Sequence, residues 1–320
     1  MRNSSYSTRF NFSKLSRYNS VFFTYIFLLF VFIIFYIFFP LYRTSANISN
    51  LLIQIAPLAL VALGQTVVLI GGGIDLSVGS IISLTTIIVA NLMGNSFYGI
   101  ILGLLLAVAL ALIIGFINAV ICNETNIPPL IVTLSMSYIV QGIVLWYRSA
   151  PGGSVPRGLL KILLYRFNIL SMPIIMVIIV YAIFTFIMSR STFGLHTYAI
   201  GNNEQYSRMA GVNVKKIRIG NYMISSFLAC FAGLILASRI GSGAPLIGDP
   251  YTLESLTAAI IGGMSFSGGE GFVLGALGGS AIVGMISNAL NISGVDPFYQ
   301  YIFRGALLII AMVINSFKRR

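Results

Sequence analysis

The sequence predicts an all-α polytopic membrane protein with about ten transmembrane segments and glycine-rich breaks between some of its helices. Of its 320 residues, 58% are hydrophobic and only 8% are charged, whereas an average soluble domain carries roughly 25% charged residues. The mean hydropathy of +0.96 is too high for one compact core to hide the apolar side chains, so most of them must face lipid or neighbouring membrane helices. These values exclude an ordinary soluble globular protein.

Ten apolar segments are expected to be membrane spans, because one helical crossing takes about 20 residues. The first, at 21–39, follows a basic arm over residues 1–20. It is too long for the core of a signal peptide and ends at Pro40 without a small-residue cleavage motif, so we expect it to be retained. The other nine lie at 51–70, 77–94, 98–121, 130–147, 169–188, 219–238, 254–264, 272–292 and 299–316. Together they predict a single transmembrane domain over residues 21–317.

The distribution of Lys and Arg predicts the orientation of the chain. Basic residues gather in the arm 1–20, in the loop 189–218 and in the tail 318–320, and cytoplasmic loops carry an excess of such residues. An even number of crossings places all three on the cytoplasmic side. The segment 148–168 is also basic, yet this topology places it outside, so it disagrees with the other three.

Enzymatic chemistry is disfavoured by the scarcity of ionisable groups. Seven acidic residues and one histidine, His196, leave little for acid–base catalysis or a metal site. None of the five lysines follows a glycine, which excludes a phosphate-binding GxxxxGK[ST] loop. Cys122 and Cys230 lack CxxC spacing and are expected to be buried thiols. The net charge of +12 is attributed to membrane topology rather than to nucleic-acid binding. We expect no catalytic residue, metal or cofactor in this chain.

Uncharged polar residues recur within the predicted spans. In lipid each such group needs a partner, so they are expected to face other helices or a wet cavity. Two interpretations remain open, hydrogen bonds between helices and a path for a neutral polar solute. The residues are Gln54, Gln65, Thr66, Asn91, Asn118, Thr133, Ser135, Ser137, Gln141, Asn221, Ser225, Ser226, Ser287, Asn288 and Asn291.

Two glycine-rich breaks, at 71–80 and 262–271, interrupt the apolar sequence, and each contains one acidic residue. One interpretation is a re-entrant turn in which Asp75 and Ser77 accept N–H groups at the start of the next helix. The other is that the broken helices line a path or meet a partner. Their likeness suggests a duplicated helix–break–helix unit. The candidate residues are Gly72, Gly73, Asp75, Ser77 and Gly79 in the first break, Gly268, Gly269, Glu270 and Gly271 in the second, and Asn288.

The polar loop 189–218 is expected to contain a short helix over 203–209, between Gly201 and Gly211. Asn202 or Asn203 would cap it, and Glu204 and Arg208 would pair at i, i+4. Such a helix could transmit motion, or the loop could be a solvated connector whose charges only fix the topology.

Four ordered stretches resemble the membrane permeases of ribose-type ATP-binding cassette (ABC) sugar importers. They are GGGIDLSVGS within 70–80, FGLHTYAIGNNEQYSRMAGVNV at 193–214, TAAIIGGMSFSGGEGFVLG at 257–275 and the ending at 288–311. The resemblance covers the chain from about residue 45. It implies a pore formed with a second permease copy or a paralogue, a cytoplasmic ATPase that binds ATP and Mg, and a periplasmic or surface-tethered binding protein. The loop helix then resembles a coupling helix, with Glu204 and Arg208 as its polar anchors.

We therefore expect a multi-pass permease of the inner membrane with cytoplasmic termini, which translocates a monosaccharide, ribose being favoured. One alternative is a permease of the same fold family for another ligand, namely galactose, xylose, a furanosyl autoinducer or branched-chain amino acids. Another is an ion-coupled secondary transporter, for which Asp75 and Glu270 are the candidate ionisable residues within the membrane.

Overall fold

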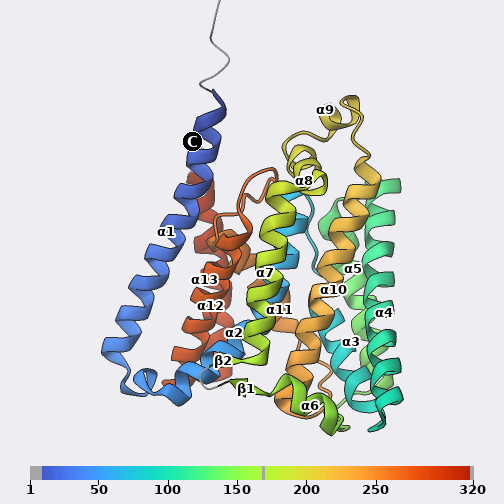
Figure 1. Ribbon diagram of the computed structural model, residues 1–320, viewed down its shortest axis with the longest axis vertical. Coiled ribbons are helices and arrows are strands. Elements are labelled where there is room, and N and C mark those ends of the chain that lie inside the picture. Colours follow the sequence, from blue (N-terminus) through green and yellow to red (C-terminus); the bar gives the residue numbers. More distant parts are fainter. Residues whose placement is uncertain (1–8, 168–169, 318–320) are drawn as a thin grey trace, which may run out of the picture.

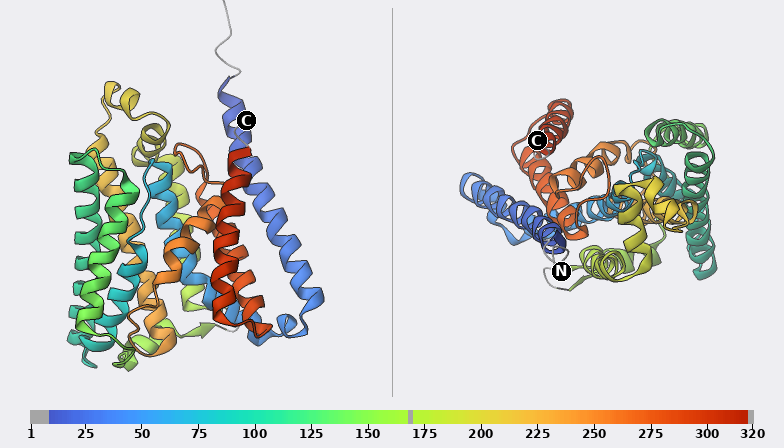
Figure 2. Two further views of the ribbon diagram at one scale, coloured as in Figure 1. Left: turned by 180° about the vertical axis from the view of Figure 1, so that it is seen from behind. Right: turned by 90° about the horizontal axis from the view of Figure 1, so that it is seen from above.

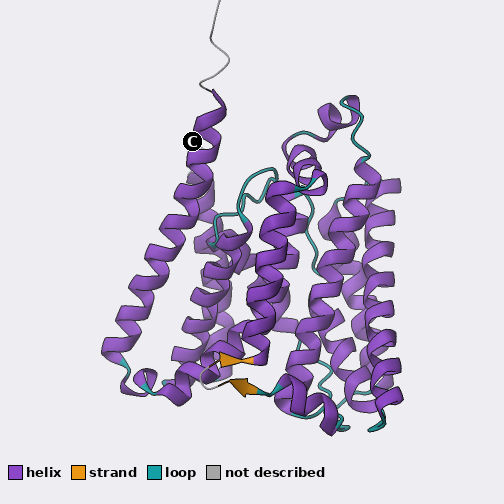
Figure 3. Ribbon diagram, in the orientation of Figure 1, coloured by secondary structure: helices purple, strands orange, loops and turns teal. Residues whose placement is uncertain are grey.

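A computed structural model describes residues 9–167 and 170–317, so part of the arm 1–20 and the whole tail 318–320 lie outside the described residues. The described chain is almost entirely helical (Figure 3). Its elements are α1 (Arg9–Phe38), the 3-10 helix η1 (Pro40–Arg43), α2 (Ser45–Ile70), α3 (Val78–Asn91), α4 (Phe97–Glu124), α5 (Pro129–Tyr147), α6 (Arg157–Leu163), β1 (Arg166–Phe167), β2 (Leu170–Ser171), α7 (Met172–Arg190), α8 (Thr192–Asn202), α9 (Glu204–Met209), α10 (Val214–Ile240), α11 (Asp249–Ile261), α12 (Val273–Ile292) and α13 (Pro297–Phe317). The strands β1 and β2 form a short antiparallel pair.

Local sequence signals explain where several helices begin. Thr44 precedes α2, and its side chain accepts the backbone N–H of Asn47. Ser96 precedes α4 and accepts the N–H of Gly99 in the same way. Pro129 opens α5 at a position where no helical N–H is needed. These caps satisfy N–H groups that a helix start leaves without a partner.

Each of the ten predicted spans corresponds to a helix of the described chain, which confirms the predicted fold class. Within the described chain, seven helices are long and apolar enough to cross a membrane. The remaining three predicted spans correspond to α3 with 14 residues, α11 with 13 residues and α13. The first two are therefore half-length helices.

The two ends of the bundle carry different elements (Figure 1). The start of α1, the end of α13 and the helices α8 and α9 lie at one end, which we call the α9 end. The helix α6 and the strands β1 and β2 lie at the other, which we call the α6 end. The loop 189–218 thus lies on the same side as the described start and end of the chain, opposite the segment 148–168, as an even number of crossings requires.

Each half-length helix completes a crossing together with an extended segment. Residues 71–77 lead from the end of α2 into the bundle before α3 begins, and residues 241–248 lead from α10 to α11 (Figure 2). The starts of α3 and α11 meet, because a Cβ on Gly79 would lie only 2.7 Å from the carbonyl oxygen of Gly248. Two of the ten crossings are therefore made by a half-length helix and an extended segment. The N-termini of these two helices, α3 and α11, meet inside the bundle.

This arrangement differs from the expected duplication. The counterpart of the break at 71–77 is the segment 241–248, which the sequence analysis did not single out. The second predicted break, at 262–271, instead connects α11 to α12 and contacts the end of α2. The likeness of the two glycine-rich sequences reflects a shared need for tight turns at neighbouring positions rather than equivalent places in a repeat.

The helix α2 forms the centre of the bundle, since 94% of the residues in its most apolar stretch are buried. It packs against α10, α11 and α12, and α10 in turn packs against α3 and α4. Small residues permit these contacts. A Cβ on Gly115 of α4 would lie 2.7 Å from the carbonyl oxygen of Tyr222 on α10, and one on Gly275 of α12 would overlap the backbone of Gly262. Close backbone approach at small residues is typical of membrane bundles.

Candidate transport and coupling sites

The first break is organised around a buried carboxylate. Asp75 is fully buried, and its Oδ1 accepts the backbone N–H of Ser77 at 3.0 Å and the Ser77 hydroxyl at 2.6 Å. Asn118 of α4 donates to the same hydroxyl at 2.9 Å. The carboxylate thus accepts an N–H at the start of α3 as expected, whereas the side chain of Ser77 donates to Asp75 instead of capping the helix.

The backbone of this break finds its partners on α5 and α10. The hydroxyl of Thr133 accepts the backbone N–H of Leu76 and donates to the carbonyl of Ile74, and both hydrogen bonds are 3.1 Å long. The hydroxyl of Tyr222 donates to the same carbonyl at 3.3 Å and packs against Gly73. Irregular backbone inside a membrane persists only where protein or water satisfies it. Two of the polar residues noted in the spans, Asn118 and Thr133, therefore form hydrogen bonds that hold this break.

The end of α8 joins both predicted breaks. Gly201 lies against the carbonyl of Ile70, at the end of α2, so closely that a Cβ would overlap it. The same Cβ would lie 2.5 Å from the backbone nitrogen of Gly269, which donates to the carbonyl of Ile70 at 2.9 Å. Asn202 donates to the carbonyl of Gly269 at 3.2 Å. Three candidate segments that are distant in sequence thus meet at one point of the α9 end.

The remainder of the second break contacts the same region. A Cβ on Gly268 would lie 2.8 Å from the Cα of Gly72, and the hydroxyl of Tyr198 on α8 donates to the carbonyl of Gly271 at 2.8 Å. Glu270 is exposed. It therefore has no role comparable to that of the buried Asp75, although both acids lie among glycines in the sequence.

The expected short helix is confirmed as α9. Asn203 caps it by accepting the N–H of Tyr206 at 3.0 Å, and Glu204 pairs with Arg208 at 2.6 Å. Gly211 follows the helix with a φ of 83°, a conformation that favours glycine. A capped helix of six residues therefore stands at the α9 end, next to the junction of the two breaks (Figure 1).

Glu204 also ties α9 to the body of the bundle. Its second oxygen pairs with Arg218 at 2.6 Å, and Arg218 donates to Asn123, at the end of α4, at 2.9 Å. The side chain of Arg218 is 17% exposed and that of Arg208 is 53% exposed. Partial burial raises the pKa of Glu204, but the hydrogen bonds and charges of Arg208 and Arg218 outweigh it, so the pKa lies below its ordinary value.

Three exposed apolar side chains on this loop were missed by the sequence analysis, which singled out polar anchors. Leu195 on α8, Tyr206 and Met209 are 66%, 71% and 77% exposed. Tyr206 and Met209 are three residues apart and share one face of α9. That spacing was readable from the sequence once the helix was placed, and exposed apolar side chains outside the spans are candidate contacts for another protein.

Asn288 belongs to a polar cluster between α2 and α12. It exchanges two hydrogen bonds of 3.3 Å with Asn47 and donates to Gln54 at 3.5 Å. Both α2 residues lie in the half of that helix nearer the α6 end. The cluster is separate from the two breaks, so the sequence-predicted path residues occupy two places in the bundle.

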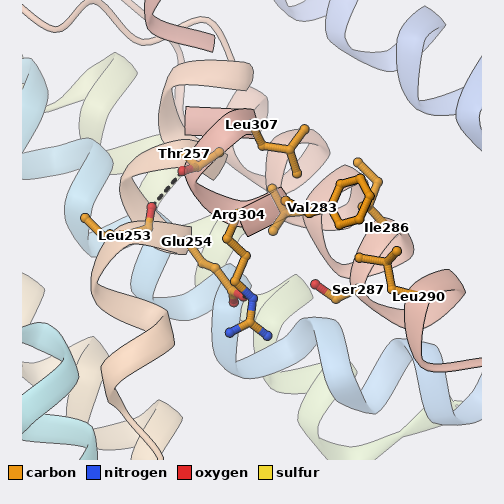
Figure 4. Close-up of a pocket in the computed structure, with 10 residues that line it drawn as sticks. Leu253, Glu254, Thr257, Val283, Ile286, Ser287, Leu290, Arg304 and Leu307 are labelled. Atoms are coloured by element: carbon orange, nitrogen blue, oxygen red, sulfur yellow. Dashed lines mark hydrogen bonds and ion pairs between the residues drawn. The ribbon is translucent and has the colours of Figure 1, made fainter. Parts of the chain in front are cut away.

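A buried ion pair was also missed. Glu254 of α11 pairs with Arg304 of α13 at 2.7 Å, and their side chains are 10% and 25% exposed. Figure 4 shows the two side chains meeting between α11, α12 and α13. The sequence analysis considered only Asp75 and Glu270 as ionisable groups within the membrane, although Glu254 and Arg304 lie in the predicted spans 254–264 and 299–316. In the structure α11 begins earlier, at Asp249, which places Glu254 inside the helix.

This architecture defines an integral membrane protein with broken helices, and the comparisons with known proteins identify its class. The family model described as "Branched-chain amino acid transport system / permease component" matches residues 47–312. The chain belongs to this family, whose members are the permease components of ABC importers. It is therefore a multi-pass inner-membrane transport subunit rather than an enzyme, and ATP hydrolysis is performed by a separate subunit.

Relatives of this chain include several sugar permeases. It is 32% identical over 282 residues to the ribose import permease protein RbsC of Bacillus subtilis, with 87% of each chain covered. It is 32% identical to the fructose import permease protein FrcC of Rhizobium meliloti, over 83% of this chain and 77% of the relative. It is 34% identical to the L-arabinose transport system permease protein AraH of Escherichia coli, over 89% and 87%. No solved structure matches the chain significantly.

Proposed function

We propose that this chain forms the membrane path of an ABC importer for a monosaccharide, with ribose as the favoured substrate. Support comes from the relatives, whose names specify ribose, fructose and arabinose. The composition of the path agrees with a neutral solute, because the polar groups inside the bundle are largely amides and hydroxyls. In this proposal a second copy of the chain, or a paralogue, completes the assembly.

The observation that carries the proposed mechanism is the junction of α8 with both breaks. The helices α8 and α9 act as the coupling element that docks on the ATPase, whose subunit holds ATP and Mg. Gly201 rests on the carbonyl of Ile70 and on the backbone of Gly269. A displacement of α8 is therefore passed to the end of α2 and to the segment 262–272, and so to the half-helices α3 and α11. Closure of the ATPase subunits would shift the path from outward-facing to inward-facing.

In this orientation the α9 end is cytoplasmic, in line with the basic loop 189–218, and the described start and end of the chain lie on that side. The α6 end then faces outward. Residues 148–167 lie at that end, and residues 241–248 lead from it into the bundle. In this proposal the α6 end around residues 148–167 and the start of the segment 241–248 is the surface on which a sugar-binding protein would release its ligand. An isolated bridge between Gly152 and Gly243 joins these two segments.

The test is uptake of radiolabelled ribose by proteoliposomes that contain this chain, its ATPase and its binding protein. Glu204→Ala/Arg208→Ala is expected to lower uptake while ATP hydrolysis continues, because it removes the ion pairs that hold α9. Lys215→Ala is the matched control, since its exposed pair with Glu124 lies at the same end of the bundle. Uptake by this chain alone would overturn the proposal, and so would equal effects of the two substitutions.

A further inference from the structure

A cavity of about 390 Å³ lies among α2, α10, α11, α12 and α13. Its polar lining consists of Gln54, Arg239, Tyr251, Glu254, Ser287 and Arg304, and the rest of its wall is mostly apolar. Pockets that hold small molecules measure roughly 300–1,000 Å³ and combine an apolar wall with a few polar groups. The cavity is separate from the two glycine-rich breaks and from the coupling element.

The ion pair of Glu254 and Arg304 forms part of this lining. Desolvation makes a buried ion pair costly, and well-packed apolar residues of similar volume are often as stabilising. Ionisable residues inside a membrane bundle are accordingly a sign of function. Arg239, in the last turn of α10, is exposed and lines the cavity where it opens at the α6 end. Stability alone therefore does not account for the buried pair of Glu254 and Arg304.

The lining groups complement a ligand that carries several hydroxyl groups. Each hydroxyl of a sugar both donates and accepts a hydrogen bond. Arg239 and Arg304 supply donors, Glu254 supplies acceptors, and Gln54 and Ser287 supply both kinds. Tyr251 contributes an aromatic ring to the same wall.

A polar strip leads from the cavity toward the α6 end. Gln54 accepts a hydrogen bond from Asn288 at 3.5 Å, and Asn288 is bonded to Asn47 at 3.3 Å. Asn47 lies near the start of α2, at the α6 end. A solute that enters from that end would meet these amides before it reaches Glu254 and Arg304.

We propose that this cavity is a transient binding site for a neutral monosaccharide within a single permease chain, with Glu254, Arg239 and Arg304 as its hydrogen-bonding groups. This inference rests on the proposed function and specifies where one copy of the chain holds the solute. The affinity of the site for the sugar is expected to be low, because a solute that is bound tightly inside the membrane would not leave.

The first experiment measures protection of an introduced thiol. Ser287→Cys is prepared in the full chain, reconstituted with its ATPase in nanodiscs, and labelled with a small methanethiosulfonate. Ribose at four times its dissociation constant is expected to slow labelling about fivefold, while leucine at the same concentration leaves the rate unchanged. Ser154→Cys is the control, because Ser154 is exposed outside the cavity, and ribose should not alter its labelling. The native Cys122 and Cys230 are buried and give the background rate.

The second experiment separates binding from a structural role of the ion pair. Glu254→Met/Arg304→Met removes both charges and keeps apolar volume, so its melting temperature is expected to stay near that of the wild type. The proposal predicts that it loses ribose uptake but keeps ATP hydrolysis that the binding protein stimulates. Wild-type uptake by this variant would overturn the assignment. So would labelling of Ser287→Cys that ribose does not slow, or a thiol there that no reagent reaches. Failure of the proposed function is distinct, because the wild-type complex would then import no sugar at all.

Discussion

The backbone N–H of Gly269 donates to the carbonyl of Ile70 at 2.9 Å, and this bond joins the segment between α11 and α12 to the end of α2. Gly201 of α8 lies against both partners of the bond. The last turn of α8 is thus seated on the two places where the chain enters or leaves the half-length helices. Any movement of α8 must change this contact.

Replacement of Gly201 by alanine tests the contact. The added methyl group would overlap the carbonyl of Ile70, and overpacking of this kind costs about 1–3 kcal/mol. We expect Gly201→Ala to lower the melting temperature and to reduce sugar uptake more than ATP hydrolysis. Gly142→Ala is the control, because nothing lies within 4 Å of a Cβ there, and alanine is favoured over glycine inside a helix. Uptake by Gly201→Ala at the level of Gly142→Ala would contradict this account.

The two arginines that pair with Glu204 should differ in importance. Arg208 is mostly exposed, and exposed i, i+4 pairs contribute only about 0.3–0.5 kcal/mol. Arg218 is more buried and also holds Asn123, so its loss should cost about 1–3 kcal/mol. Hydrogen exchange of the α9 amides should therefore accelerate more in Arg218→Ala than in Arg208→Ala. Equal acceleration would show that Arg218 does not anchor the helix.

The exposed apolar face of α9 should bind the ATPase in the proposed assembly. Tyr206→Ala/Met209→Ala is expected to weaken assembly at least tenfold, since anchor residues of an interface typically contribute more than about 1 kcal/mol each. The melting temperature of the isolated chain should not change, because both side chains are exposed. Gln205→Ala, an exposed neighbour on the same helix, serves as the control. Affinity for the ATPase that survives the double substitution would exclude this face as the contact.

The stability of α9 should depend on pH through Glu204. Its folded pKa lies below the ordinary Glu value, which is about 4.3. Its ion pairs therefore stabilise the folded chain fully above that value, and the contribution is lost as the pH falls through the lower folded pKa. We expect the wild type to melt above Glu204→Gln at pH 7 and the difference to vanish in acid. A difference that is constant with pH would mean that the charge of Glu204 does not matter.

The sequence was sufficient to predict the helices, the capped loop helix and the family. Apolar runs, Asn203 with its following Glu204, and the spacing to Arg208 are local signals, and local signals determine helix positions and caps. The basic residues also predicted that the loop 189–218 lies at the same end of the bundle as the start of α1 and the end of α13. These features depend on residues that are neighbours in the chain.

Contacts between distant segments could not be predicted in the same way. The pairing of Gly79 with Gly248 and of Gly201 with Gly269 depends on how crossings are arranged, and a glycine in the sequence does not reveal its partner. The ion pair of Glu254 and Arg304 was missed for the same reason. It became visible only when α11 was placed beside α13.

The most direct test of the central claim measures what is transported and what drives it. Proteoliposomes with the chain, its ATPase and its binding protein are loaded with ATP on the ATPase side and offered labelled ribose or leucine. The account predicts accumulation of ribose that needs ATP and all three components, with no accumulation of leucine. Accumulation of leucine in place of ribose, or ribose uptake driven by an ion gradient without ATP, would contradict it.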